Sequence, residues 1–192
     1  MTREEVLQVV DRAAAAAGAA VFTGNGYSAQ ALAAIADRPS HFYMLGSMGL
    51  CATLAAGFSG RSGRPVVAVE GDGNALMGLS GLPVAAASAG RPFVHIVLDN
   101  GLHETTGGQL TLAGGVDFGL LALGAGYDRL YRVSDLAGLD AALRAGLSAQ
   151  ERTFVHAVTE PDHGPPRPRV AHHPREIARR FRSEATGRRV QG

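Results

Sequence analysis

Two polar turns hold the side chains of this sequence that are best suited to chemistry. Asp72 lies between two glycines directly after the apolar run 66–69, and Asn100 follows a second apolar run, residues 93–98. A carboxylate, an amide oxygen and turn carbonyls form an oxygen-only ligand set, which suits a hard cation such as Mg²⁺ that shares its shell with water and phosphate oxygens. A helix that begins after Asp72 would also favour an anion there. The two turns therefore predict a site for a magnesium-bound phosphate group.

The two turns can meet only if the elements around them form a parallel strand–helix–strand unit. Residues 66–69 and 93–98 are short, apolar and rich in β-branched side chains, as buried strands are. Residues 75–89 between them have the composition of a helix. In such a unit both turns fall at the carboxyl edge of the sheet, where open α/β sheets bind ligands. We therefore expect Asp72 and Asn100 to lie side by side.

The rest of the chain alternates between strand patterns and helix patterns. Thr2 is a suitable N-cap for the first helix, which has acidic residues in its first turn and ends at Gly18. Six strands alternating with helices indicate an α/β fold, a three-layer sandwich with a central, mostly parallel six-stranded sheet. We expect strands over residues 19–22, 41–45, 66–69, 93–98, 129–133 and 153–158. The expected helices are 2–17, 29–36, 50–58, 75–89, 116–125, 135–150 (with Ser134 as N-cap) and 174–183, and residues 60–64 form a loop.

Two further glycine-rich turns follow strands and could touch a ligand. Residues 23–28 place Gly24 and Asn25 between a strand and a helix, as phosphate-binding turns often are. Contact with a cofactor or substrate, a purely structural turn, and a dinucleotide fingerprint without its third glycine all fit this turn. The turn 46–49 precedes a helix of small residues, and a methionine such as Met48 is usually a filler of the core. The residues alone leave a functional and a structural role open for both turns.

The polar stretch 101–109 follows the second of the two central turns. A long loop rich in hydrogen-bonding side chains usually has a function. His103 could contact a substrate or carry a proton near neutral pH, and the alternative is a structural histidine. Glu70 directly precedes the Asp72 turn, and we expect it to face a loop or solvent. Cys51 is expected to be buried and inert.

Composition excludes several classes of protein. The chain has 192 residues, 46% of them hydrophobic, and a net charge of +1, so nothing points to nucleic acid or to a membrane surface. A single cysteine supplies neither a disulfide framework nor an iron–sulfur site. No signal peptide or long apolar segment is evident, so we expect a cytoplasmic location. Residues 1–160 are expected to form the main domain, and residues 161–192 a proline-rich connector and a basic helix packed on or near it.

Three motifs together resemble a known family. GSMG (46–49), GDGNALM (71–77) and LDNGLHETTGGQ (98–109) are similar to segments of thiamine-diphosphate-dependent 2-oxoacid decarboxylases, in which GDG, a spacer and an asparagine pair form the cofactor signature. Asp99 replaces the first asparagine of that pair. The resemblance covers about residues 19–182 and corresponds to the pyrophosphate-binding domain. It is closest to phosphonopyruvate decarboxylases and to sulfopyruvate decarboxylase β subunits.

The resemblance implies a role for each residue that matches a motif. Asp72, Asn100 and the backbone carbonyl of Leu102 would bind Mg²⁺, and Met48 would wedge between the two rings of thiamine diphosphate and keep the cofactor bent. The Gly46 carbonyl would accept a hydrogen bond from the cofactor amino group. The remaining cofactor contacts would come from Ser47, Gly71, Gly73 and Asn74 of these motifs and, on the evidence of the glycine-rich turn alone, from Gly24 and Asn25. The candidates for substrate contact or catalysis are His103, Thr105 and Thr106.

The resemblance also implies a reaction and a partner. The reaction would be decarboxylation of a 3-substituted 2-oxoacid, phosphonopyruvate to phosphonoacetaldehyde and CO₂, with thiamine diphosphate and Mg²⁺. These enzymes need a second domain whose glutamate activates the cofactor, and 192 residues leave no room for it. We therefore expect a separate pyrimidine-binding subunit and a hetero-oligomer such as α2β2. The alternatives are a sulfopyruvate decarboxylase β subunit, a thiamine-dependent carboligase of the same architecture, and a non-catalytic cofactor-binding subunit.

Overall fold

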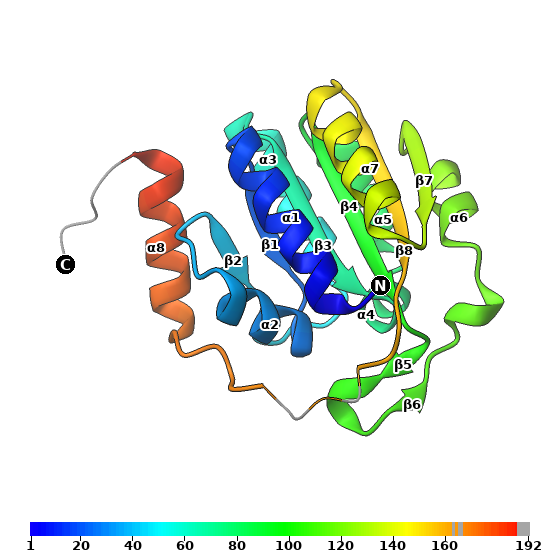
Figure 1. Ribbon diagram of the computed structural model, residues 1–192. Coiled ribbons are helices and arrows are strands. Elements are labelled where there is room, and N and C mark those ends of the chain that lie inside the picture. The colour runs from blue at the N-terminus through cyan, green and yellow to red at the C-terminus, as the bar shows by residue number, and fades with distance from the viewer. Residues whose placement is uncertain (163, 165–166, 188–192) are drawn as a thin grey trace.

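A six-stranded, all-parallel sheet forms the centre of the protein. The structure is a computed structural model that describes residues 1–162, 164 and 167–187. The strand order is β2-β1-β3-β4-β8-β7, and β5 and β6 form a separate antiparallel pair (Figure 1). This architecture confirms the α/β fold expected from the sequence. The strands are β1 (Ala20–Thr23), β2 (His41–Tyr43), β3 (Val66–Gly71), β4 (Phe93–Asp99), β5 (Leu102–His103), β6 (Gln109–Leu110), β7 (Arg129–Val133) and β8 (Arg152–Val158).

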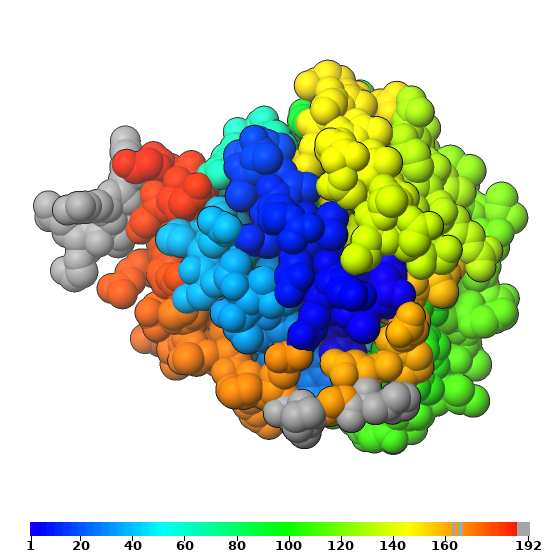
Figure 2. Space-filling model, viewed as in Figure 1, coloured from blue at the N-terminus to red at the C-terminus, as the bar shows by residue number. Residues whose placement is uncertain are grey.

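Helices cover both faces of the sheet and make it a three-layer sandwich. Because side chains alternate along a strand, Val94 and Ile96 of β4 pack into the core beneath one helix layer, and Phe93 and Val97 into the core beneath the other. Figure 2 shows the first layer from outside, with α1 in dark blue and α7 in yellow. No helix in the described ranges is long and apolar enough to cross a membrane, and the expected cytoplasmic location stays a prediction. The first layer holds α1 (Arg3–Ala17), α2 (Tyr27–Ile35) and α7 (Leu136–Ser148), and the second holds α3 (Cys51–Ser62), α5 (Gly81–Ser88) and α6 (Phe118–Ala125).

The C-terminal helix α8 (Pro174–Thr186) covers the β2 edge of the sheet (Figure 1). Its Phe181 is buried, and the ring centroid lies 5.0 Å from that of Phe22, 5.4 Å from Phe42 and 4.9 Å from Phe58. Aromatic rings at these separations add to the burial of apolar surface. The basic helix is therefore attached to the domain through an apolar side. The connector 161–168 lies partly outside the described residues, and the domain division at residue 160 stays a prediction.

Three expectations about the helices were wrong. The helix expected over residues 75–89 is two helices, α4 (Asp72–Met77) and α5, because Gly78 packs against the backbone of Gly49 and a side chain has no room there. The loop expected at 60–64 is largely helical, since α3 continues to Ser62. In α7 the N-cap is Asp135 rather than Ser134, because its carboxylate accepts a hydrogen bond from the Gly138 amide at 2.8 Å. The N-terminal helix has the expected Thr2 cap, and the Thr2 backbone amide in turn donates a hydrogen bond to the Glu5 carboxylate.

Candidate active site

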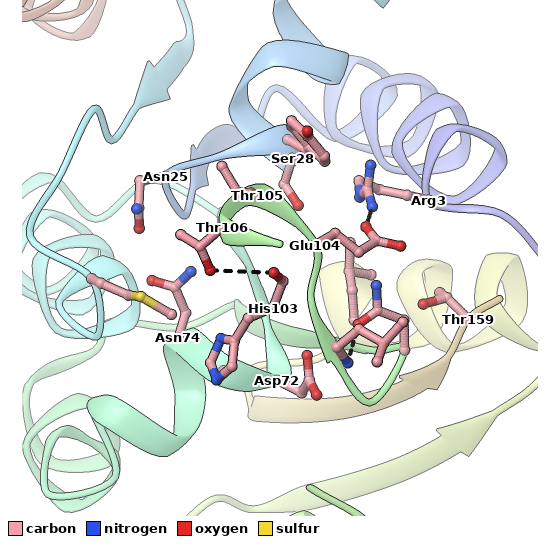
Figure 3. A pocket seen from close by; sticks show the side chains of 17 residues that line it. Arg3, Asn25, Ser28, Asp72, Asn74, His103, Glu104, Thr105, Thr106 and Thr159 are labelled. Carbon is pink, nitrogen blue, oxygen red and sulfur yellow. Dashed lines mark hydrogen bonds and ion pairs between the residues drawn. The ribbon is translucent and has the colours of Figure 1, made fainter. Parts of the chain in front are cut away.

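A pocket opens at the carboxyl ends of β3 and β4, where the two central turns meet (Figure 3). Asp72 and Asn100 both line it, so the juxtaposition expected from the strand–helix–strand pattern is present. Most of the other predicted site residues line the same pocket. These are Asn25, Met48, Gly71, Gly73, Asn74, Leu102, His103, Thr105 and Thr106.

Three predicted cofactor contacts lie outside the pocket lining. Gly24 packs against Glu70: a Cβ added at Gly24 would lie 3.1 Å from the Glu70 Cβ, so a larger residue would crowd that strand end. Gly46 and Ser47 are exposed, and Ser47 has a positive φ of 55°, which is uncommon for a residue with a side chain. The proposed contacts of these three residues with the cofactor stay predictions.

The surroundings of Asp72 disfavour the charged form of its carboxyl group. Its side chain is 2% exposed, and the Thr111 hydroxyl donates a hydrogen bond of 2.5 Å to Oδ2. Burial raises the pKa of Asp72, the nearby Asp99 charge adds to that effect, and the Thr111 hydrogen bond opposes it. A bound cation would relieve both the burial and the repulsion from Asp99. The structure thus gives Asp72 the electrostatic setting of a metal ligand.

The turn that carries Asn100 is fixed by side-chain hydrogen bonds. The Asn100 Oδ1 accepts a bond from the Leu102 amide at 3.0 Å, and the Asp99 Oδ1 accepts one from the Gly101 amide at 3.2 Å. The other Asp99 oxygen lies 2.8 Å from Nε2 of His156. Gly101 has a φ of 72°, which a residue without a Cβ adopts readily. Asp99 therefore positions the turn from behind and leaves the pocket to Asn100.

We expected Glu70 to face a loop or solvent, and this was wrong, because the residue is buried with 3% exposure. Strand β3 continues through Gly71, so Glu70 points into the core beneath α3 and α5, where it meets β4. Its Oε1 lies 2.9 Å from Nε2 of His95, whose Nδ1 lies 2.8 Å from the Tyr127 hydroxyl. The tautomer with a proton on Nε2 satisfies both contacts. These three polar groups form a buried network immediately before the Asp72 turn.

Several pocket residues carried no sequence signal. Arg3, from the first turn of α1, lines the pocket, is 6% exposed and pairs with Glu104. Thr159, just beyond β8, also lines the pocket, and Thr111 reaches Asp72 from beyond β6. Arg3 and Thr159 lie far in sequence from both central turns, and Thr111 reaches Asp72 only because the chain turns back after residue 102, so the folded chain brings all three there. Tyr27 also lines the pocket; it lies within the predicted turn 23–28, although only Gly24 and Asn25 of that turn were predicted to be site residues.

The donor set fits a magnesium-bound diphosphate. In the described ranges no three His, Cys, Asp or Glu side chains are grouped so that they could hold a metal ion. A cation at Asp72 and Asn100 would therefore need backbone carbonyls, water and the oxygens of a ligand, which is the usual shell of Mg²⁺ on phosphates. The Oδ1 atom of Asn25 is buried and has no hydrogen-bond partner among the described residues, so it can accept a bond from a ligand.

The fold is that of an α/β domain whose pocket has oxygen donors suited to a magnesium diphosphate. The comparison with protein families shows which family of such domains the chain belongs to. Residues 23–157 match the family described as "Thiamine pyrophosphate enzyme, C-terminal TPP binding domain". The chain belongs to this family, and its cofactors are thiamine diphosphate and Mg²⁺.

Individual relatives show which members of this family the chain is similar to. The chain is 42% identical over 170 residues to a phosphonopyruvate decarboxylase of Streptomyces viridochromogenes, covering 88% of this chain and 42% of that one. It is 35% identical over 167 residues to a sulfopyruvate decarboxylase subunit beta of Methanothermobacter thermautotrophicus, covering 87% of each. A solved structure of a putative thiamin diphosphate-dependent enzyme from Mycobacterium smegmatis matches with a TM-score of 0.67 at 27% identity, over 84% of this chain and 32% of that one. The chain thus spans less than half the length of the phosphonopyruvate decarboxylases it matches.

Proposed function

We propose that this chain is the diphosphate-binding part of an enzyme that decarboxylates a 3-substituted 2-oxoacid, with phosphonopyruvate as the first candidate substrate. The observation that carries the proposal is the pocket in which Asp72, Asn100 and Met48 meet. The 42% identity to a protein named phosphonopyruvate decarboxylase supports the choice of substrate. The product would be phosphonoacetaldehyde.

The residues that match the family motifs have defined parts in this proposal. Asp72, Asn100 and the Leu102 carbonyl would hold the Mg²⁺ ion, and Met48 would support the bent cofactor. When bound, thiamine diphosphate would supply the nucleophilic carbon and the electron sink that decarboxylation of a 2-oxoacid requires. His103, Thr105 and Thr106 line the same pocket. In this proposal His103 would contact the substrate or the leaving carboxylate, and the two threonines would supply hydrogen-bonding groups.

We further propose that a separate pyrimidine-binding subunit supplies the activating glutamate, in a hetero-oligomer such as α2β2. The support is the relative named subunit beta, of which this chain covers 87%. The same coverage favours a second candidate function, the β subunit of a sulfopyruvate decarboxylase. A phosphonate and a sulfonate are both anionic groups that need similar hydrogen-bond donors, so the two substrates make similar demands on this pocket.

The test is CO₂ release by the chain co-purified with its native partner, in the presence of Mg²⁺ and thiamine diphosphate. Phosphonopyruvate, sulfopyruvate and pyruvate are compared, and Asp72→Ala in the same complex is the control. Preferred turnover of phosphonopyruvate, absent without the partner, is the expected result, and preferred turnover of sulfopyruvate would move the assignment to the second candidate. A condensation product formed when an acceptor aldehyde is added would indicate a carboligase. No CO₂ from any acid, with the cofactor bound, would contradict the proposed function, and full activity of the chain alone would contradict the separate subunit.

A further inference from the structure

A short hairpin crosses the cofactor pocket and contacts three separate elements. It runs over residues 102–110 and consists of β5, a single helical turn at Glu104–Thr106, and β6. One contact of the hairpin is with α1, one with the turn before α2, and one with the first turn of α4. In Figure 3 the Arg3 and Glu104 side chains point toward each other, on the side of the pocket away from Asn25. The hairpin is therefore held at both ends of the pocket.

The contact with α1 is a buried ionic cluster. Arg3 pairs through Nη2 with Glu104 and through Nη1 with Asp162 at 3.3 Å, and the Asp162 amide donates a hydrogen bond of 2.5 Å to the other Glu104 oxygen. The Arg3 and Glu104 side chains are only 8% and 9% exposed. The guanidinium also lies 5.4 Å from the centre of the Tyr27 ring. This cluster ties α1, the hairpin and the segment after β8 to one another.

Two glycines make room for the hairpin in this position. A Cβ at Gly26 would lie 2.6 Å from Oγ1 of Thr105, and a Cβ at Gly73 would overlap the ring of His103. The His103 ring therefore lies directly on Gly73, between Asp72 and Asn74 in Figure 3. Gly73 is one of the residues that we assign to the cofactor. A diphosphate bound against this face of Gly73 would meet the His103 ring, so the position of the hairpin affects access to the site.

We propose that Arg3 is a positioning residue that holds Glu104, and through it the 102–110 hairpin, over the cofactor pocket. The hairpin carries Leu102 and His103, so its position affects both the metal site and the substrate side of the pocket. A buried arginine that loses its carboxylate partner keeps an uncompensated charge, which favours a state in which the segment opens to water. The cluster thus controls how often the hairpin opens and how fast the cofactor leaves. This inference rests on the cofactor site and not on the identity of the 2-oxoacid.

The test uses the full chain with Arg3→Met and, separately, Glu104→Gln. The matched control is Arg64→Met, because Arg64 forms an ion pair of 2.7 Å with Glu184 and does not line the pocket. Hydrogen exchange of amides 102–110 is measured without cofactor, since exchange reports local opening. Release of radiolabelled thiamine diphosphate into excess unlabelled cofactor is measured with Mg²⁺ present. Both pocket variants are expected to exchange at least tenfold faster in the hairpin and to release cofactor at least fivefold faster, with the amides of β3 and β4 unchanged.

Hairpin exchange that stays at the wild-type rate in a folded variant would overturn the inference. The same acceleration in Arg64→Met would also overturn it, because the effect would then be general. If Arg3→Met does not fold, Glu104→Gln alone decides, since it keeps the shape of the side chain and removes only its charge. If both variants exchange faster but the wild-type chain binds no thiamine diphosphate, the positioning role within the fold is supported, and our assignment of the cofactor residues is contradicted.

Discussion

Replacing His95 by leucine tests the buried network beside the Asp72 turn. His95 is fully buried and bridges two polar groups: its Nε2 lies 2.9 Å from the Glu70 carboxylate, and its Nδ1 lies 2.8 Å from the Tyr127 hydroxyl. The second Glu70 oxygen has no hydrogen-bond partner among the described residues. His95→Leu would therefore leave a buried carboxylate with no partner for either oxygen.

The expected loss of stability follows from this burial. Removing one partner of a buried, hydrogen-bonded charge costs about 3–5 kcal/mol. The Tyr127 hydroxyl loses its acceptor, which costs about 1–3 kcal/mol, and the added leucine surface offsets part of the total. We expect the free energy of unfolding to fall by about 3–5 kcal/mol. For a chain of this length that corresponds to a melting temperature lower by about 6–20 °C.

Urea unfolding of the cofactor-free chain at pH 7 measures this effect, and a double variant separates charge from packing. Glu70→Met with His95→Leu removes both partners, so we expect it to be more stable than His95→Leu alone. The control is His172→Leu, because His172 pairs with Asp37 at 2.7 Å on the surface and such a pair contributes about 0–1 kcal/mol. A loss below about 1 kcal/mol in His95→Leu, or a double variant less stable than it, would refute the reasoning.

Two further predictions follow from buried side chains, and a third from one close backbone contact. Burial raises the pKa of both Tyr43 and Tyr127, so the folded chain should keep two of its 4 tyrosines protonated well above pH 10. The free energy of unfolding should fall as pH rises in this range, because only the unfolded chain releases those protons. The absorbance of tyrosinate during an alkaline titration measures this. Cys51 is buried, as expected, and burial raises the pKa of its thiol, so it should react with a thiol reagent only at the rate of unfolding, whereas rapid labelling of the folded chain would contradict this placement. Gly78→Ala should destabilise the chain by about 1–3 kcal/mol in thermal unfolding and weaken cofactor binding, because its Cβ would displace Gly49 next to Met48; an unchanged melting temperature would count against that contact.

Local patterns predicted most of the fold. Alternation of apolar runs with helix compositions is a property of short segments, and so are the Thr2 cap and the glycine turns. Because parallel strands place their following turns at one edge, the spacing of Asp72 and Asn100 was enough to predict that both line one pocket. These features need no knowledge of contacts between distant segments.

Contacts between distant segments decided the features that the sequence did not predict. Glu70 is buried because β3 is longer than its apolar run and because His95 on the next strand supplies a partner. The break between α4 and α5 depends on Gly49, far back in the chain. Arg3 reaches the pocket from the first turn of the chain's first helix, through Glu104. None of these partners is visible in a local pattern, because each contact exists only after the sheet has formed.

Binding of thiamine diphosphate to the chain, with and without Mg²⁺, tests the central claim most directly. Calorimetry would compare the wild type, Asp72→Ala, and Asp135→Ala as a control, because Asp135 caps α7 and does not line the pocket. We predict Mg²⁺-dependent binding by the wild type and by Asp135→Ala, and binding at least about 100-fold weaker in Asp72→Ala, which corresponds to about 2.8 kcal/mol. Undiminished Mg²⁺-dependent binding by Asp72→Ala would contradict the assignment of this pocket as the cofactor site.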